Sequence, residues 1–240
     1  MNTEEFDRYV KPYDMSDWMI DLKYHHTYRV VDYCVKIALS EGMNEHEVVV
    51  AGTAGLLHDI ARFEQVRQFH TFYDKNSFDH GDYGYGILKN DNYIMKYVDN
   101  EVDAEAVLKA VKYHNKIYLD ADVTDYERKI CQITRDADKL DIMDKQNNDI
   151  KDGSTVINEE VMKAIRNHKL VNNANVKTHA DSIVRCLAFM FDFNFKQSFV
   201  ELTEHEIVQR KFELLENYID INQVKEIEDI IYKYIEEKTR

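Results

Sequence analysis

The sequence predicts an all-α protein. Only one proline, Pro12, occurs in 240 residues, so little along the chain interrupts a helix. Apolar side chains recur at helical spacing through most of the sequence, and several segments begin with the capping pattern in which Asn or Thr precedes Glu by three residues. A chain of this length can bury a large core, and we expect one domain over residues 1–240.

The first predicted helix carries His26. Val30, Cys34 and Ile37 follow His26 at helical spacing, so this histidine lies on the apolar side of its helix. A glycine, Gly42, ends the segment. An imidazole in that position faces the interior of the protein.

The second predicted helix opens at Asn44 with Glu47 and leads to the pair His58-Asp59. His58 shares a helix face with Ala54, so it also points inward. A buried carboxylate without a partner is costly, and the pair therefore requires a cation. A divalent metal fits this need, because imidazole and carboxylate are ligands of Zn, Mn, Fe and Ni.

Three more predicted helices each place one polar side chain on the apolar face: His80, His114 and Asp138. The segment from Gln68 to Ser77 is predicted to be a loop before the His80 helix, and to act as a lid. The neighbours that set the faces are Gly84 and Ile87 for His80, Val107, Ala110 and Val111 for His114, and Ile130 and Ile133 for Asp138, in a helix opened by Thr124 with Glu127.

A polar stretch from Asp144 to Ser154 precedes the C-terminal part of the chain. Leu187–Phe195 alternates like a strand, but its flanks keep helical spacing and favour a helix. Thr203 with Glu206 has the pattern of a helix start. We expect residues 155–240 to form a helical cap packed on the N-terminal bundle, with three or four helices at roughly 158–168, 178–198, 203–219 and 221–237.

Composition favours a soluble cytoplasmic enzyme. No apolar run of membrane-spanning length occurs, and the acidic N-terminus does not have the pattern of a secretory signal. Cys34, Cys131 and Cys186 lie far apart in apolar patterns, as reduced core thiols do. The net charge of −14 argues against nucleic acid as the partner, but not against a small phosphorylated substrate.

The order of these polar residues resembles the HD superfamily of metal-dependent phosphohydrolases: a histidine, a His-Asp pair, two histidines and an aspartate. The segments that carry the resemblance are His26–Val30, Leu57–Ile60 and Asp136–Asp141. The resemblance covers residues 20–145, which we expect to form a metal-binding core within an HD-domain helical bundle. It is specific for the superfamily and uninformative about the substrate.

The resemblance implies one divalent ion, or two, with Mn, Fe, Mg, Zn and Ni all open. His80 and His114 are expected to bind substrate phosphate, to transfer protons or to hold a second ion. The primary ligands would be His26, His58, Asp59 and Asp138. Two alternatives to this set remain open: His25 in place of His26, and Asp136 or Asp141 in place of Asp138. His25, however, falls off the apolar stripe.

Arg62 lies one helical turn beyond His58, on the same helix face, and is the best candidate for a phosphate clamp. An ion pair with Glu64 or another acid explains it equally well. Lys116 and Lys139 are weaker candidates for substrate binding, as is Arg29. The catalytic set is Asp59, His80, His114 and Arg62. The remaining histidines are interpreted as surface or capping residues: His46, His70, His168, His179 and His205.

These observations predict a metal-dependent phosphohydrolase that cuts a phosphomonoester or phosphoanhydride bond of a nucleotide or a similar small metabolite. A di-iron oxygenase with the same ligands is one alternative. A non-catalytic HD module that binds a nucleotide and acts as a sensor is another. No nucleic-acid or membrane partner is expected, and the sequence is compatible with a homo-oligomer.

Overall fold

Every regular element in the described residues is helical, which confirms the predicted fold class. The structure, a computed structural model, describes residues 1–145 and 155–240. These residues form two compact units, Met1–Asp138 and Lys139–Arg240. The predicted polar stretch lies mostly outside the described residues. The expectation that residues 155–240 form a cap on the N-terminal bundle stays a prediction.

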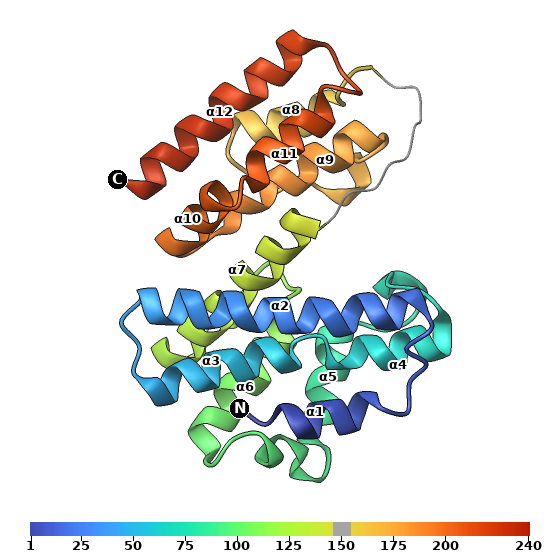
Figure 1. Cartoon of the computed structure of the whole chain (residues 1–240), viewed down its shortest axis with the longest axis vertical. Coiled ribbons are helices and arrows are strands. Elements are labelled where there is room, and N and C mark those ends of the chain that lie inside the picture. The colour runs from blue at the N-terminus through green and yellow to red at the C-terminus, as the bar shows by residue number, and fades with distance from the viewer. Residues whose placement is uncertain (146–154) are drawn as a thin grey trace. The chain divides into compact units, whose positions relative to one another are not determined.

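The first unit contains six complete helices among its described residues and most of a seventh, which continues into the second unit (Figure 1). A 3-10 turn, η1 (Asp74–Asn76), lies before α5, and η2 (Asn90–Lys96) follows it. The helices are α1 (Thr3–Val10), α2 (Trp18–Ser40), α3 (Glu45–Leu57), α4 (Ile60–Phe69), α5 (His80–Lys89), α6 (Glu101–Tyr113) and α7 (Asp125–Lys145).

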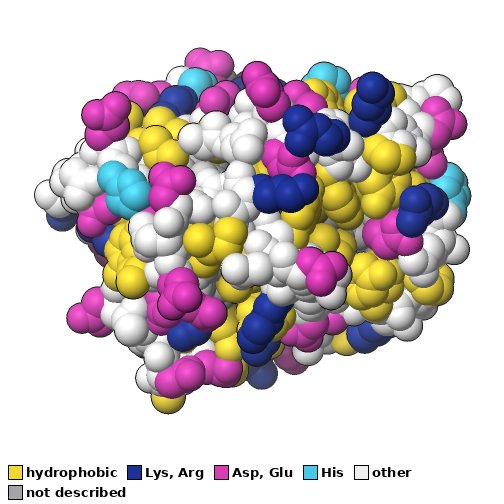
Figure 2. All heavy atoms as spheres, turned by 90° about the horizontal axis from the view of Figure 1, so that it is seen from below, with side chains coloured by type: hydrophobic (Ala, Val, Ile, Leu, Met, Phe, Trp, Pro, Cys, Tyr) yellow, Lys and Arg dark blue, Asp and Glu magenta, His cyan; other side chains and the backbone are white. Residues whose placement is uncertain are grey.

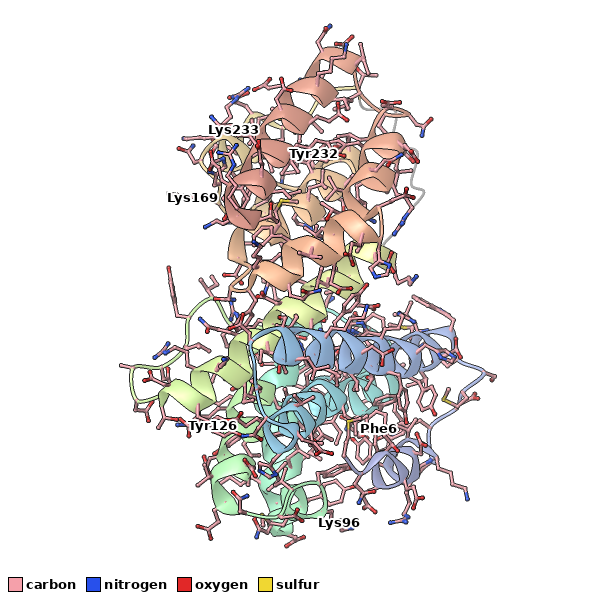
Figure 3. All side chains as sticks on the ribbon, turned by 60° about the vertical axis from the view of Figure 1, so that its left-hand side comes forward. Phe6, Lys96, Tyr126, Lys169, Tyr232 and Lys233 are labelled. Carbon is pink, nitrogen blue, oxygen red and sulfur yellow. The ribbon has the colours of Figure 1, made fainter. Side chains whose placement is uncertain are left out.

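Helices α2 and α3 pack along each other and form the centre of the first unit, with α6 against α3 and α5 against α6 (Figure 1). Helix α1 contributes Phe6, which is fully buried and lies between α1 and the rest of the bundle in Figure 3. The capping boxes predicted at Asn44 with Glu47 and at Thr124 with Glu127 are confirmed, because each pair exchanges both hydrogen bonds.

The chain breaks its helix at the His-Asp pair. Helix α3 ends at Leu57, Asp59 has φ −106° and ψ 20°, and α4 begins at Ile60. The expectation of one continuous helix through Arg62 is therefore wrong. The carbonyl of Gly55 accepts a hydrogen bond from the His58 ring instead of serving a continuing helix.

The helix expected at 221–237 is confirmed as α12 (Ile221–Thr239), but the other helices of the second unit are shorter than predicted. The 3-10 turn η4 (Ala188–Asp192) interrupts the helix expected at 178–198. The predicted helix start at Thr203 is wrong. Thr203 lies inside α10, where its hydroxyl donates to the Val200 carbonyl at 2.9 Å, and Glu206 has a left-handed backbone with φ 53°. The elements are α8 (Glu159–Arg166), η3 (Asn173–Asn175), α9 (His179–Leu187), η4, α10 (Lys196–Glu204), α11 (Ile207–Leu215) and α12 (Ile221–Thr239).

Burial agrees with most of the sequence expectations for single residues. Cys34, Cys131 and Cys186 are buried free thiols. His179 is an exception to the surface assignment, because it begins α9 with 5% of its surface exposed and its ring lies against Tyr218. None of the described helices has both the length and the apolar character needed to cross a membrane.

Candidate metal centre

Helix ends aim the ring nitrogens of two histidines at one point in the first unit. His58 and His114 each follow the last residue of a helix, α3 and α6. Their Nδ1 atoms donate to the carbonyls three residues earlier, Gly55 at 2.7 Å and Val111 at 2.8 Å. These bonds hold each ring in place and leave its Nε2 atom facing inward, the orientation that metal-binding histidines require.

His26, from the middle of α2, meets His58 from the other side. The two Nε2 atoms lie 3.2 Å apart. Asp59 Oδ2 is 3.5 Å from each of them, and Asp138 Oδ1 is 3.2 Å from His26 and 3.6 Å from His58. His26, His58 and Asp59 are buried, and Asp138 is partly exposed. We name these four residues the primary group.

The primary group fits a divalent metal ion. Donors bound at about 2.0–2.2 Å to one ion, with angles of about 90–110° between them, are separated by about 3.0–3.5 Å. The observed distances of 3.2–3.6 Å between the histidine nitrogens and the carboxylate oxygens match that spacing. Two imidazoles and two carboxylates are also a donor set that Mn, Fe, Zn and Ni accept.

Asp59 also belongs to a second cluster, through its other oxygen. Oδ1 lies 3.6 Å from His80 Nε2 and 3.5 Å from His114 Nε2, and those two nitrogens are 2.9 Å apart. All three residues are buried and offer ligand atoms close enough to hold an ion. We name Asp59, His80 and His114 the secondary group.

Arg62 lies against the secondary group. Its Nη2 lies 3.2 Å from His80 Nε2, and its Nε lies 3.4 Å from Asp59 Oδ1. The guanidinium also donates to the Asp74 carboxylate at 3.0 Å. The alternative of an ion pair with Glu64 or another acid is confirmed for other acids, Asp74 and Asp59, whereas Glu64 pairs with Arg67. Arg62 thus places positive charge on the secondary group.

Lys23 is a cation at the centre that the sequence reasoning missed. Its Nζ lies 2.6 Å from Asp59 Oδ2, and only 12% of its side chain is exposed. Lys23 stands three residues before His26 on α2, so both side chains lie on one face of that helix. That spacing was the available signal. Asp59 is therefore flanked by Lys23 at one oxygen and Arg62 at the other.

Asp74 is a second residue that the sequence reasoning did not single out. One of its oxygens accepts from His80 Nδ1 at 2.6 Å, and the other accepts from Arg62 and from Gln65 Nε2, both at 3.0 Å. Asn115 approaches Asp74 at 3.5 Å. The loop that the sequence predicts as a lid therefore carries the carboxylate that orients both His80 and Arg62.

The pKa values of the centre follow from burial and from these neighbours. Burial would raise the pKa of Asp59, but Lys23 and His58 hold it well below its usual range. Burial lowers the pKa of His58, and Asp59 and Asp138 more than offset this, raising it to about 10. Burial lowers the pKa of His114 to about 4, so this ring is neutral near pH 7.

The other candidates lie elsewhere or are engaged by neighbours. His25 is 60% exposed in its side chain and faces Asp21, outside the primary group. Lys116 pairs with Asp79 at 2.5 Å and with Asp82 at 3.0 Å. Lys139 pairs with Asp192 at 2.9 Å. Asp136 and Asp141 are both buried and engaged, and their place as alternatives to Asp138 stays a prediction.

The fold and the centre define a class of protein: an all-α bundle with a buried cluster of histidines and aspartates that can hold a metal ion. Comparison with protein families agrees. The family model of the HD domain matches residues 24–145, more than half of the 240-residue chain, and the protein belongs to the HD domain family. No curated protein and no solved structure shows significant similarity to it.

Proposed function

We propose that this protein is a metal-dependent phosphohydrolase that cuts a phosphomonoester or phosphoanhydride bond of a nucleotide or a similar small phosphorylated metabolite. The observation that carries the proposal is the surroundings of Asp59. Its two oxygens face two histidine pairs, while Lys23 and Arg62 stand beside it at 2.6 and 3.4 Å. A metal-ligand group next to two cations suits a phosphate oxygen and the water that attacks phosphorus.

In this proposal His26, His58, Asp59 and Asp138 hold one divalent ion, with Mn, Fe, Mg, Zn and Ni all open. Bound there, the ion would lower the pKa of a coordinated water and offset charge on the phosphoryl group. The Nδ1 bond from His58 to Gly55 keeps that ring in the tautomer whose Nε2 can coordinate.

His80, His114 and Arg62 would bind the phosphate. Arg62 offers a planar pair of donors that matches two phosphate oxygens. His114 is neutral near pH 7 because of burial, so its ring can pass a proton without carrying a lasting charge. Lys116 and Lys139 stay predictions as substrate ligands; Arg62 is favoured in this role because it contacts His80 and Asp59 directly.

Arg62 also favours hydrolysis over the di-iron oxygenase alternative. A second ion at the secondary group would lie against the guanidinium, which already contacts His80 and Asp59 at 3.2 and 3.4 Å. Two like charges in a buried site repel strongly. A sensor without activity remains the other alternative, and it predicts nucleotide binding with no turnover.

Three further parts of the proposal concern the binding partners, the cellular compartment and the oligomeric state. The protein would not take nucleic acid as a substrate: on the face that Figure 2 draws, Lys and Arg side chains are interspersed with Asp and Glu among the described residues. Three buried free thiols favour the reducing cytoplasm. A homo-oligomer stays a prediction.

The test is product-resolved turnover on a panel of nucleotides and other phosphoesters with added Mn²⁺. His26→Ala and Asp59→Ala should abolish release of phosphate or pyrophosphate. His25→Ala is the matched control, because His25 is the exposed neighbour of His26 on the same helix; it should keep full activity. Circular dichroism verifies that each variant is folded. A wild-type protein that binds Mn²⁺ and releases no phosphate from any compound would overturn the proposal.

A further inference from the structure

An exposed aromatic pair lies beside the metal centre. Trp18 is the first residue of α2 and the most exposed aromatic side chain of that helix, with 64% of its surface accessible. Its ring meets the half-buried ring of Phe72 edge to face, with centroids 6.4 Å apart and planes at 85°. An exposed tryptophan ring offers a large apolar face against which another flat aromatic group can pack.

The aromatic pair is joined directly to the two cations of the centre. Lys23 Nζ lies 5.4 Å and Arg62 Cζ lies 5.7 Å from the centroid of the Phe72 ring. The same two cations contact the two oxygens of Asp59. Each of these cations therefore contacts the Phe72 ring on one side and the Asp59 carboxylate on the other.

Both aromatic residues are held in place by polar contacts of their neighbours. Arg62 Nη1 donates to the Phe72 carbonyl at 2.9 Å. On the other side, Asp17 caps α2 by accepting from the Met19 backbone at 2.8 Å, and its carboxylate lies 3.5 Å from His70. The start of α2 and the loop after α4 are thus joined at this place, and the two rings are presented together.

We propose that the base of a nucleotide substrate stacks on the Trp18 ring beside Phe72, with its phosphate held by Lys23 and Arg62; we call these two rings the stacking surface. The inference rests on the proposed function and narrows its substrate class to phosphate esters that carry a flat aromatic group. Charge complementarity selects this occupant: two cations adjoin the rings on the side of the centre, where an anionic phosphate belongs. Every base has an aromatic face, so the surface would accept different bases.

Trp18 gives a direct readout, because it is the single tryptophan of the chain. Stopped-flow fluorescence in Mg²⁺ records its emission before turnover begins. Nucleoside monophosphates should quench the emission, whereas ribose 5-phosphate and inorganic phosphate should leave it unchanged. Phe72→Ala should lose most of the quenching. Tyr73→Ala is the matched control: Tyr73 adjoins Phe72 in sequence and is 75% exposed, and its loss should have no effect.

Kinetics give an independent readout of the same proposal. Trp18→Ala should raise KM for nucleoside monophosphates by about tenfold, the scale of one lost stacking contact, with kcat little changed. KM for ribose 5-phosphate should stay as in the wild type. Trp18→Phe, which keeps an aromatic face, should restore most of the affinity.

The outcomes separate this inference from the function on which it rests. The stacking surface would be overturned if nucleotides do not quench the Trp18 emission of the wild type and if Trp18→Ala and Phe72→Ala keep wild-type KM values. In that case, loss of phosphate release in Asp59→Ala would still support the hydrolase. Quenching by nucleotides in a protein that releases no phosphate would support the surface and overturn the hydrolase. Equal effects on ribose 5-phosphate and nucleotides would overturn a role in base stacking.

Discussion

Asp59 connects the two halves of the candidate centre. Its buried carboxylate faces histidine pairs on both sides and remains ionised because Lys23 and His58 outweigh the cost of burial. The sequence reasoning reached Asp59 and its histidines through their shared place on apolar helix faces. It missed Lys23, although the spacing from His26 was visible, because a lysine near a helix start is usually a solvated side chain.

The contacts of Arg62 predict how many ions the protein binds. Arg62→Met removes the positive charge from the secondary group and keeps a side chain of similar length. We expect Mn²⁺ bound per chain, measured by elemental analysis after gel filtration, to rise from one to two. Phosphate release should fall by about 100-fold or more, as when a transition-state donor is lost. The control is Arg67→Met, which replaces an exposed arginine of the same helix. One ion in both variants would show that Arg62 does not exclude the second.

The contacts of Asp74 predict a positioning role. Asp74→Asn keeps the shape of the side chain but weakens its hold on His80 Nδ1 and Arg62. We expect kcat/KM to fall by about 10–100-fold, the usual effect of losing a partner of a metal-site histidine, with little change in Tm. Asp82→Asn, at an exposed carboxylate in α5, should be silent. A variant with normal kcat/KM at every pH would contradict the role.

At the scale of elements, helical periodicity predicted which helices carry the candidate ligands, because inward-facing residues repeat with the period of the helix. It did not predict the break after Leu57. At that break the His58 ring donates to the Gly55 carbonyl, a side-chain contact that periodicity does not reveal. Nor did the sequence predict that Thr203 bonds back to its own helix, since the same residue pattern also serves as a cap.

Gly55 allows α2 and α3 to approach closely, which the sequence alone did not distinguish from an imperfect helix. A Cβ there would lie 2.8 Å from Cys34 Sγ and 3.3 Å from the Val31 backbone. Gly55→Ala should lower the free energy of unfolding by about 1–3 kcal/mol, measured with urea. Gly86→Ala, in α5 with nothing within 4 Å, should instead raise it by about 0.5–1 kcal/mol. Equal effects at both sites would contradict the packing argument.

The start of α5 predicts a pH dependence of stability. Burial tends to raise the pKa of Asp79, but Lys116 and the backbone at Asp82 outweigh it and lower the pKa to about 2. The ionised form therefore stabilises the fold above about pH 4, and this contribution is lost as the pH falls toward 2. Asp79→Asn, which can still cap the helix, should have a lower Tm than the wild type near pH 6. The difference should shrink between about pH 4 and 3, and a constant difference would contradict the assignment.

At the scale of the whole molecule, the sequence predicted an all-helical chain and a metal-binding core over residues 20–145, close to the family match at 24–145. It separated this core from a C-terminal part at 155–240, but it did not predict a unit boundary between Asp138 and Lys139, because the helical pattern of α7 is uninterrupted there. The sequence did not predict the role of the second unit either, because amphipathic periodicity identifies the buried face of a helix but not the element that covers that face.

Metal binding should stabilise the folded chain as a whole. An ion that binds only the folded state adds about 2.7 kcal/mol at a hundredfold excess over its Kd. Mn²⁺ should therefore raise Tm in differential scanning calorimetry, and EDTA should reverse the rise. His26→Ala should lose the shift, and His25→Ala should keep it. A shift of equal size in both variants would place the ion outside the primary group.

The central claim is that the centre hydrolyses a phosphate ester. The most direct test measures phosphate release in H₂¹⁸O under argon, with Mn²⁺ and the nucleotide that the wild type cleaves most readily. Attack of water on phosphorus, assisted by the centre around Asp59, predicts one solvent ¹⁸O atom in each phosphate released, with no need for oxygen. No cleavage under argon, followed by oxygen consumption and an oxidised product in air, would contradict the hydrolase and establish the oxygenase instead.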